Sequence, residues 1–147
     1  MPPLLRNLLA LVLGLVIGGS VNMALVTLGP VLIAPSAGAD MTTTQGLSAA
    51  MPLLGPQHFI FPFLAHALGT FAGALVAWWI AASHKARWAY AVGVVFLAGG
   101  IAASTMIPAP GWFIALDLLL AYLPMAWVAT RVGSSRLKSP ATSTHPI

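Results

Sequence analysis

Hydrophobic residues in this chain gather in four long runs that are separated by shorter, more polar segments. The runs cover about residues 7–28, 59–82, 88–107 and 112–130. Each has about the 20 apolar residues that an α-helix needs to cross roughly 30 Å of hydrocarbon. The pattern predicts an all-α membrane protein, an antiparallel bundle of four transmembrane helices. We expect a kink at Pro124, inside the fourth run, because proline has no N–H to offer the helix.

The segments between the runs differ in length and composition. Residues 29–58 are rich in Pro, Gly, Ser and Thr, whereas residues 83–87 form a short polar link and residues 108–111 a tight turn. After the fourth run the chain becomes rich in Ser, Pro and Thr, which is typical of a flexible end. We therefore expect residues 1–133 to form one transmembrane domain and residues 134–147 to form a flexible basic tail.

The long segment contains a signal for a short helix. Thr42 and Gln45 match a capping box, in which Thr42 begins the helix and the Gln45 side chain reaches back to it. Apolar residues then recur at helical spacing: Leu47, Ala50, Met51 and Leu54. This pattern predicts an amphipathic helix, ended by Pro52, that lies against the membrane surface or over the mouth of the bundle. An irregular loop held by the same apolar residues is the alternative.

Positive charge lies on one side of the predicted topology. The basic residues stand before the first run, between the second and third, and after the fourth: Arg6, Lys85, Arg87, Arg131, Arg136 and Lys138. Alternating helix direction brings these three places to the same side of the bilayer. Because positively charged segments stay in the cytoplasm, we expect both termini there and residues 29–58 on the outer face.

The first run also has features of a cleaved signal peptide, since Arg6 precedes an apolar stretch. Its length of about 22 residues exceeds the usual 7–15 of a signal peptide, and no clear Ala-x-Ala cleavage site follows. We therefore expect a retained helix and a multi-pass protein of the cell membrane.

Composition supports the same class of protein. Of the 147 residues, 59% are hydrophobic and 5% are charged, whereas soluble domains carry about 25% charged residues. The chain has no cysteine, which excludes disulfides, iron–sulfur centres, thiolate zinc sites and cysteine nucleophiles. The net charge of +4 comes from cations scattered over three short segments, which suits anionic lipid headgroups and gives no basis for nucleic-acid binding.

Glycines recur on three of the predicted helices. Lipid provides no hydrophobic drive for helices to associate, so close helix contacts depend on small residues. The candidate packing positions are Gly14, Gly18, Gly69, Gly73, Gly99 and Gly100. They predict contacts either among the four helices or with a second copy or a larger membrane complex, and the sequence leaves both open.

Four polar residues inside the runs are expected to form a buried cluster: Asn22, His66, Thr70 and Asp117. Three of them lie about 8–10 Å from the outer end of their helix at 1.5 Å per residue, and Thr70 follows one turn after His66. Polar groups in hydrocarbon are costly and usually face the bundle interior, so the others would offset the desolvation of Asp117. Two interpretations stay open: hydrogen bonds that fix helix packing, or a proton-linked or ligand-binding site open to the outer face.

No catalytic residue, cofactor or metal site is expected. The chain lacks the HExxH, P-loop and GxGxxG motifs, and its only carboxylates are Asp40 and Asp117. His58 and His66 are about 12 Å apart along a helix, too far to share one metal ion. We therefore expect the chain not to be an enzyme.

Three segments carry a resemblance: residues 18–23 (GGSVNM), residues 58–70 (HFIFPFLAHALGT), and Asp117 with residues 121–125 (AYLPM). Through them the chain resembles, over about residues 8–130, a group of small four-span bacterial inner-membrane proteins. Because apolar stretches match easily, the resemblance rests on the polar positions: Asn22, His58, His66, Thr70 and Asp117. It implies a bacterial inner membrane and four spans, and the group has no established activity to carry over.

Two functions follow from these patterns. The first is a non-enzymatic packing or accessory subunit in the lipid bilayer, which acts through helix contacts with itself or with a larger membrane complex. The alternative is a small proton- or ion-linked transporter or sensor with a buried polar site that opens to the outer face.

Overall fold

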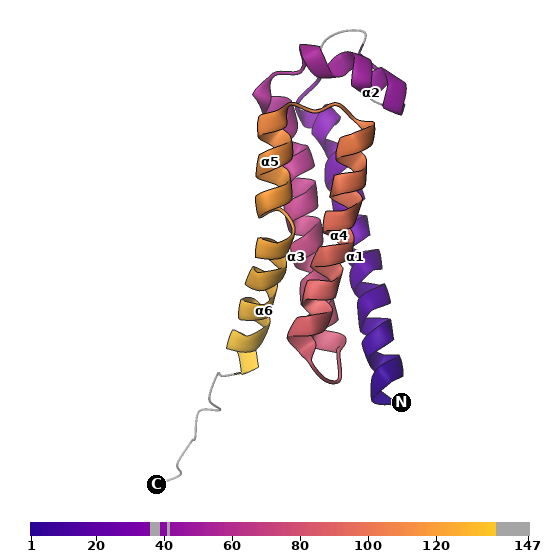
Figure 1. Ribbon diagram of the computed structural model, residues 1–147, viewed down its shortest axis with the longest axis vertical. Coiled ribbons are helices and arrows are strands. Elements are labelled where there is room, and N and C mark those ends of the chain that lie inside the picture. Colours follow the sequence, from indigo (N-terminus) through magenta and orange to yellow (C-terminus); the bar gives the residue numbers. More distant parts are fainter. Residues whose placement is uncertain (36–38, 41, 138–147) are drawn as a thin grey trace.

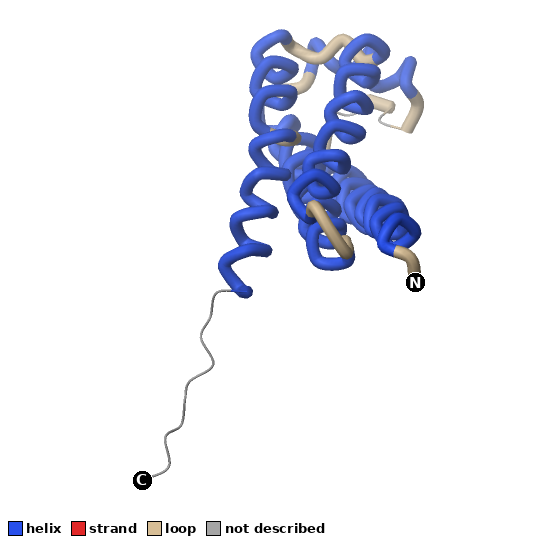
Figure 2. Tube along the Cα trace, turned by 60° about the horizontal axis from the view of Figure 1, so that its bottom comes forward, coloured by secondary structure: helices blue, strands red, loops and turns tan. Residues whose placement is uncertain are grey.

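The protein is an all-α bundle of four membrane-spanning helices, as predicted. The computed structural model describes residues 1–35, 39–40 and 42–137, and it contains helices and loops but no strand in those ranges (Figure 2). Three spans are continuous helices: α1 (Pro3–Leu32), α3 (Ile60–Ile80) and α4 (Lys85–Met106). The fourth is broken into α5 (Gly111–Leu120) and α6 (Leu123–Leu137).

The helices extend beyond the predicted runs at several ends. The first begins at Pro3 and continues to Leu32, a length of 30 residues. The last continues to Leu137, so residues 134–137, which were expected to belong to the tail, are helical. Polar residues therefore continue this helix beyond the apolar run. Residues 138–147 lie outside the described residues.

Successive spans run in opposite directions, so both ends of the helical bundle are well defined (Figure 1). One end, here called the basic end, holds the start of α1, the α3–α4 turn and the end of α6 (Figure 1). The five described Arg and Lys residues stand in these segments: Arg6, Lys85, Arg87, Arg131 and Arg136. The opposite end, here called the loop end, holds the long segment after α1 and the α4–α5 turn.

A short helix lies in the long segment at the loop end, so the helical interpretation of that segment is confirmed. The segment contains α2 (Thr44–Ala50), followed by the 3-10 turns η1 (Met51–Leu53) and η2 (Pro56–Phe59). The predicted cap is displaced by one residue: Thr43, not Thr42, accepts a hydrogen bond from the Gly46 N–H at 3.0 Å. Thr42 instead donates its backbone N–H and its hydroxyl to Asp40.

Helices α1 and α3 approach so closely that only glycine fits at their crossing. A Cβ atom placed on Gly73 would lie 2.5 Å from the Gly14 carbonyl oxygen, and one on Gly18 would lie 2.6 Å from the Gly69 oxygen. These four glycines therefore pack within the chain. Gly99 does not, because a Cβ there would meet nothing within 4 Å.

The half of the bundle nearest the basic end has a closely packed apolar core. It is formed by α3, α4 and α6 through the buried residues Ala74, Ala77, Trp78, Ala89, Val92, Ala126 and Ala129. Small side chains let the three helices close on one another, and the Trp78 ring fills the remaining space against Gly133.

The outside of the bundle is apolar as well. Large hydrophobic side chains such as Leu4, Val16 and Leu119 are exposed along the spans. Water would not tolerate so much contiguous apolar surface, whereas lipid tails cover it at no cost. With four helices of sufficient length and hydropathy, the chain is an integral, multi-pass membrane protein.

Candidate functional site: a pocket with a polar floor

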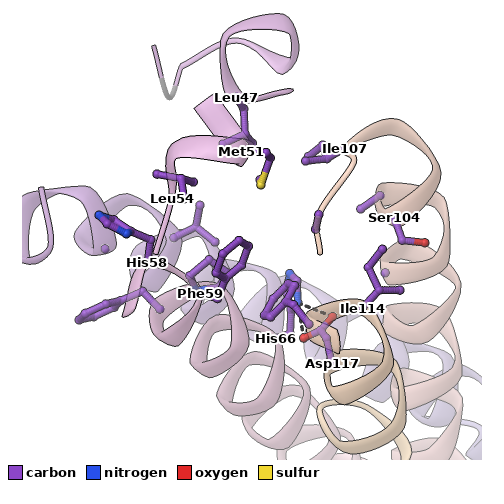
Figure 3. Close-up of a pocket in the computed structure, with 18 of the residues that line it drawn as sticks. Leu47, Met51, Leu54, His58, Phe59, His66, Ser104, Ile107, Ile114 and Asp117 are labelled. Atoms are coloured by element: carbon purple, nitrogen blue, oxygen red, sulfur yellow. Dashed lines mark hydrogen bonds and ion pairs between the residues drawn. The ribbon is translucent and has the colours of Figure 1, made fainter. Parts of the chain in front are cut away.

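A cavity of about 240 Å³ opens at the loop end of the bundle. Its walls come from α1, α3, α4 and α5, and Leu47, Met51 and Leu54 of the long segment lie over it (Figure 3). Most of the lining side chains are aliphatic or aromatic. Cavities of about 150 Å³ hold benzene, so this one suits a somewhat larger apolar molecule.

His66 and Asp117 form the polar floor of this pocket, where they point toward one another (Figure 3). The Nδ1–H of His66 donates to both carboxylate oxygens of Asp117, at 2.8 and 2.9 Å. The Asp117 side chain is 6% exposed and that of His66 is 24% exposed. The pair therefore joins α3 to α5, with the imidazole between the carboxylate and the cavity.

Tyr122 is the third member of the floor, and the sequence analysis did not single it out. Its hydroxyl donates to the second carboxylate oxygen of Asp117 at 2.9 Å, and its ring stacks on the His66 ring with centroids 5.7 Å apart. Gly100 of α4 leaves the space for it, since a Cβ there would collide with the Tyr122 hydroxyl. In the sequence, the one sign of this role was that Tyr122 places a hydroxyl five residues after Asp117 in an apolar run.

The break between α5 and α6 brings Asp117 and Tyr122 to the same place. On a straight helix, positions five apart point about 140° away from each other at 100° per residue. Pro124 cannot donate to the carbonyl of Leu120, and the helix is interrupted at residues 121–122. The interruption lets the Tyr122 side chain reach the carboxylate five residues earlier, and it confirms the predicted distortion at Pro124.

These contacts fix the hydrogen-bonding role of His66. The carboxylate of Asp117 accepts from Nδ1, so that nitrogen carries a proton, and Nε2 is the ring nitrogen left toward the pocket. Asp117 also lines the pocket, but it is buried and already accepts from His66 and Tyr122. The floor thus offers a ligand Nε2 of His66, which accepts a hydrogen bond when the imidazole is neutral and donates one when it is protonated.

The structure does not bring the other two predicted cluster residues to Asp117. Thr70 is fully buried, but its hydroxyl has no hydrogen-bond partner among the described residues. Asn22 is half-buried and lies against Gly69, at 3.0 Å from the site of a Cβ on that glycine. The hydrogen bonds expected from Asn22 and Thr70 are therefore replaced by the one from Tyr122.

His58 stands at the rim of the pocket and not on its floor. Its two ring nitrogens lie 3.2 Å from the carbonyl oxygens of Gly55 and Ala34. It thereby ties the segment after α1 to η2 and helps to shape the pocket mouth.

The described residues offer few groups for metal binding or for nucleophilic catalysis at the pocket. Within the described ranges, no three His, Asp or Glu side chains gather where they could hold a metal ion. The one hydroxyl among the residues that line the pocket belongs to Ser104, which donates to the Ile101 carbonyl of its own helix at 2.7 Å.

No protein family, curated protein or solved structure matches the chain. The resemblance to small four-span bacterial inner-membrane proteins therefore stays a prediction, and the function has to be argued from the site itself.

Proposed function

We propose that this membrane protein is a sensor that binds a small, mostly apolar molecule from the outer side of a bacterial inner membrane. The observation that carries the proposal is the pocket at the loop end, which is mostly apolar on its walls and has the polar pair His66 and Asp117 on its floor. Ligand sites typically combine a predominantly apolar lining with a few placed polar groups.

A sensor is favoured over a transporter because the pocket has no continuation toward the basic end. Beyond Tyr122, the path along the bundle axis meets the closely packed cluster around Ala77, Val92 and Ala126. A transported molecule would need polar or open space in this half, and four spans are few for alternating access. Within this proposal the chain is a binding protein and not an enzyme.

The proposed orientation of the protein in the membrane rests on the distribution of its charged residues. The basic end carries all five described Arg and Lys side chains, which favours a cytoplasmic location for it and for both termini. The pocket then opens to the outer face.

Binding of naphthalene and naphthol to the purified protein tests the proposed function. We expect the wild-type protein to retain both compounds, and naphthol more strongly, because its hydroxyl can reach Nε2 of His66. Ala103→Phe fills the pocket and should abolish binding of both, whereas His66→Phe should remove only the preference for naphthol. Equal binding to the wild type and Ala103→Phe in ligand-observed NMR would contradict the proposal.

A role as a packing or accessory subunit is the second candidate, and one observation favours it. A Cβ atom placed on Gly19 or Gly99 would have nothing within 4 Å, so contacts within the chain do not explain these glycines. A neighbouring helix of a second copy or of another subunit could approach there. Native mass spectrometry in mild detergent tests this role, and a monomer with no co-purifying protein would contradict it.

A further inference from the structure

A second hollow, independent of the pocket, lies at the basic end between α1 and α4. This groove has a volume of about 320 Å³ and is lined by Asn7, His84, Arg87, Trp88 and Ala91. Residues 87, 88 and 91 lie at helical spacing on one face at the start of α4, and His84 precedes the helix as its N-cap. The groove therefore has a cationic and aromatic wall.

Two neighbouring cationic side chains already donate hydrogen bonds to backbone carbonyls at the end of α3. Arg6 donates through Nε to the Ile80 carbonyl at 2.7 Å. The Lys85 ammonium donates to the carbonyls of Trp78, Trp79 and Ala81 at 2.8–3.2 Å. Both side chains satisfy carbonyl groups that a helix C-terminus leaves without partners.

Asn7 completes this arrangement and fixes the wall of the groove. It is 6% exposed. Its side-chain oxygen accepts from the Ala82 N–H at 2.8 Å, and its amide donates to the Ser83 hydroxyl at 3.1 Å. The α3–α4 turn is thereby held against α1, directly before His84 and Arg87.

Arg87 and His84 have a different environment from Arg6 and Lys85. Both side chains are exposed, and neither makes a hydrogen bond or ion pair with the described residues. The two side-chain carboxylates cannot compensate them, because Asp40 lies in the loop-end segment and Asp117 is held by His66 and Tyr122. Among the described residues, none supplies an anion to this groove.

We propose that the groove binds a phosphate group, and that the phosphodiester of an anionic lipid headgroup supplies it. Arg87 provides the planar guanidinium that matches phosphate oxygens, His84 provides a second donor, and the Trp88 indole suits the depth of lipid headgroups. Basic pockets between membrane helices are known to take such headgroups. The site lies at the opposite end of the bundle from the His66 pocket, so a result against one proposal leaves the other unaffected.

Lipid retention in native mass spectrometry tests the site, with protein taken from bicelles of equal phosphatidylglycerol and phosphatidylcholine. We expect wild-type protein to retain phosphatidylglycerol several-fold over phosphatidylcholine and Arg87→Gln to lose this preference. Arg136→Gln is the matched control, because Arg136 is an exposed cation at the same end that does not line the groove. An equal loss in both variants, or none in Arg87→Gln, would overturn the proposal.

A second arm separates the lipid from free phosphate. Either phosphatidylglycerol or inorganic phosphate is added to protein in phosphatidylcholine. The unfolding temperature is then measured for the wild type and for His84→Gln. Stabilisation by phosphatidylglycerol but not by inorganic phosphate supports a lipid headgroup. Equal stabilisation by inorganic phosphate at the same concentration would overturn the lipid assignment.

Discussion

His66 of α3 donates one ring N–H to both carboxylate oxygens of Asp117 on α5, at 2.8 and 2.9 Å. The two residues are 51 positions apart in the chain, so this contact holds the fourth span against the second at the depth of the pocket. It also leaves the other ring nitrogen toward the cavity. Structure and proposed ligand recognition thus depend on the same pair.

The pair should show energetic coupling. We expect Asp117→Asn and His66→Gln each to destabilise the protein, and the double variant to lose less than the sum of the two. The coupling should be about 0.5–3 kcal/mol, because each single variant leaves a partner without its charge-assisted bond. Unfolding in detergent measures all three free energies. Strictly additive losses would mean that the two side chains do not interact.

Removal of the Tyr122 hydroxyl should weaken the floor without disturbing the helix break. Tyr122→Phe keeps the ring that stacks on His66 and deletes only the donor to Asp117. We expect a loss of about 1–3 kcal/mol, because the variant leaves a buried carboxylate with one donor fewer. Tyr90→Phe is the control, because that hydroxyl is not part of the floor. Equal losses of unfolding free energy in both variants would contradict the assigned role.

The crossing of α1 and α3 should not tolerate a methyl group. Gly73→Ala places a Cβ 2.5 Å from the Gly14 oxygen, and the backbones must separate to relieve this overlap. We expect a loss of about 1–3 kcal/mol, as for other overpacked sites. Gly99→Ala is the matched control on α4, where nothing lies within 4 Å, and its unfolding free energy in detergent should equal that of the wild type or exceed it.

The cap of α2 should depend on the ionisation of Asp40. Hydrogen bonds from the side chains of Thr42 and Thr43 lower the pKa of this carboxyl from 3.8 to about 2. Its stabilising effect on the loop should therefore be complete above pH 3.8, decline below it and disappear as the pH falls through about 2. Hydrogen exchange of the Gly46 amide measures this, and Asp40→Asn should reduce its protection at neutral pH. Unchanged protection in Asp40→Asn would show that Asp40 does not support the cap.

The spans and their order could be predicted from the sequence because hydropathy over a membrane thickness is a strong, local signal. Helix ends were less predictable, since the polar and basic residues after Thr130 continue α6 to Leu137. The Gly14–Gly73 and Gly18–Gly69 contacts follow from residue size, but the open surroundings of Gly99 depend on how α4 is rotated in the bundle.

The candidate site could be predicted only in part. The shared depth of His66 and Asp117 indicated that they could meet, because helix rise fixes depth. Depth does not fix rotation, and for that reason Asn22 faces Gly69 and does not reach Asp117. Tyr122 escaped notice because its approach to Asp117 requires the interruption at residues 121–122, which no helical periodicity describes.

Accessibility of single introduced cysteines tests most directly whether the pocket opens at the loop end and is closed toward the basic end. The chain has no native cysteine, so each label reports one position. In sealed vesicles with a small, membrane-impermeant thiosulfonate, Ser104→Cys in the pocket wall should react from the outer face only. Ala126→Cys in the buried core should react from neither face, and Ala86→Cys at the basic end should react only from the cytoplasmic face. Reaction of Ser104→Cys from the cytoplasmic face, or of Ala126→Cys from either, would contradict a pocket that ends at His66 and Asp117.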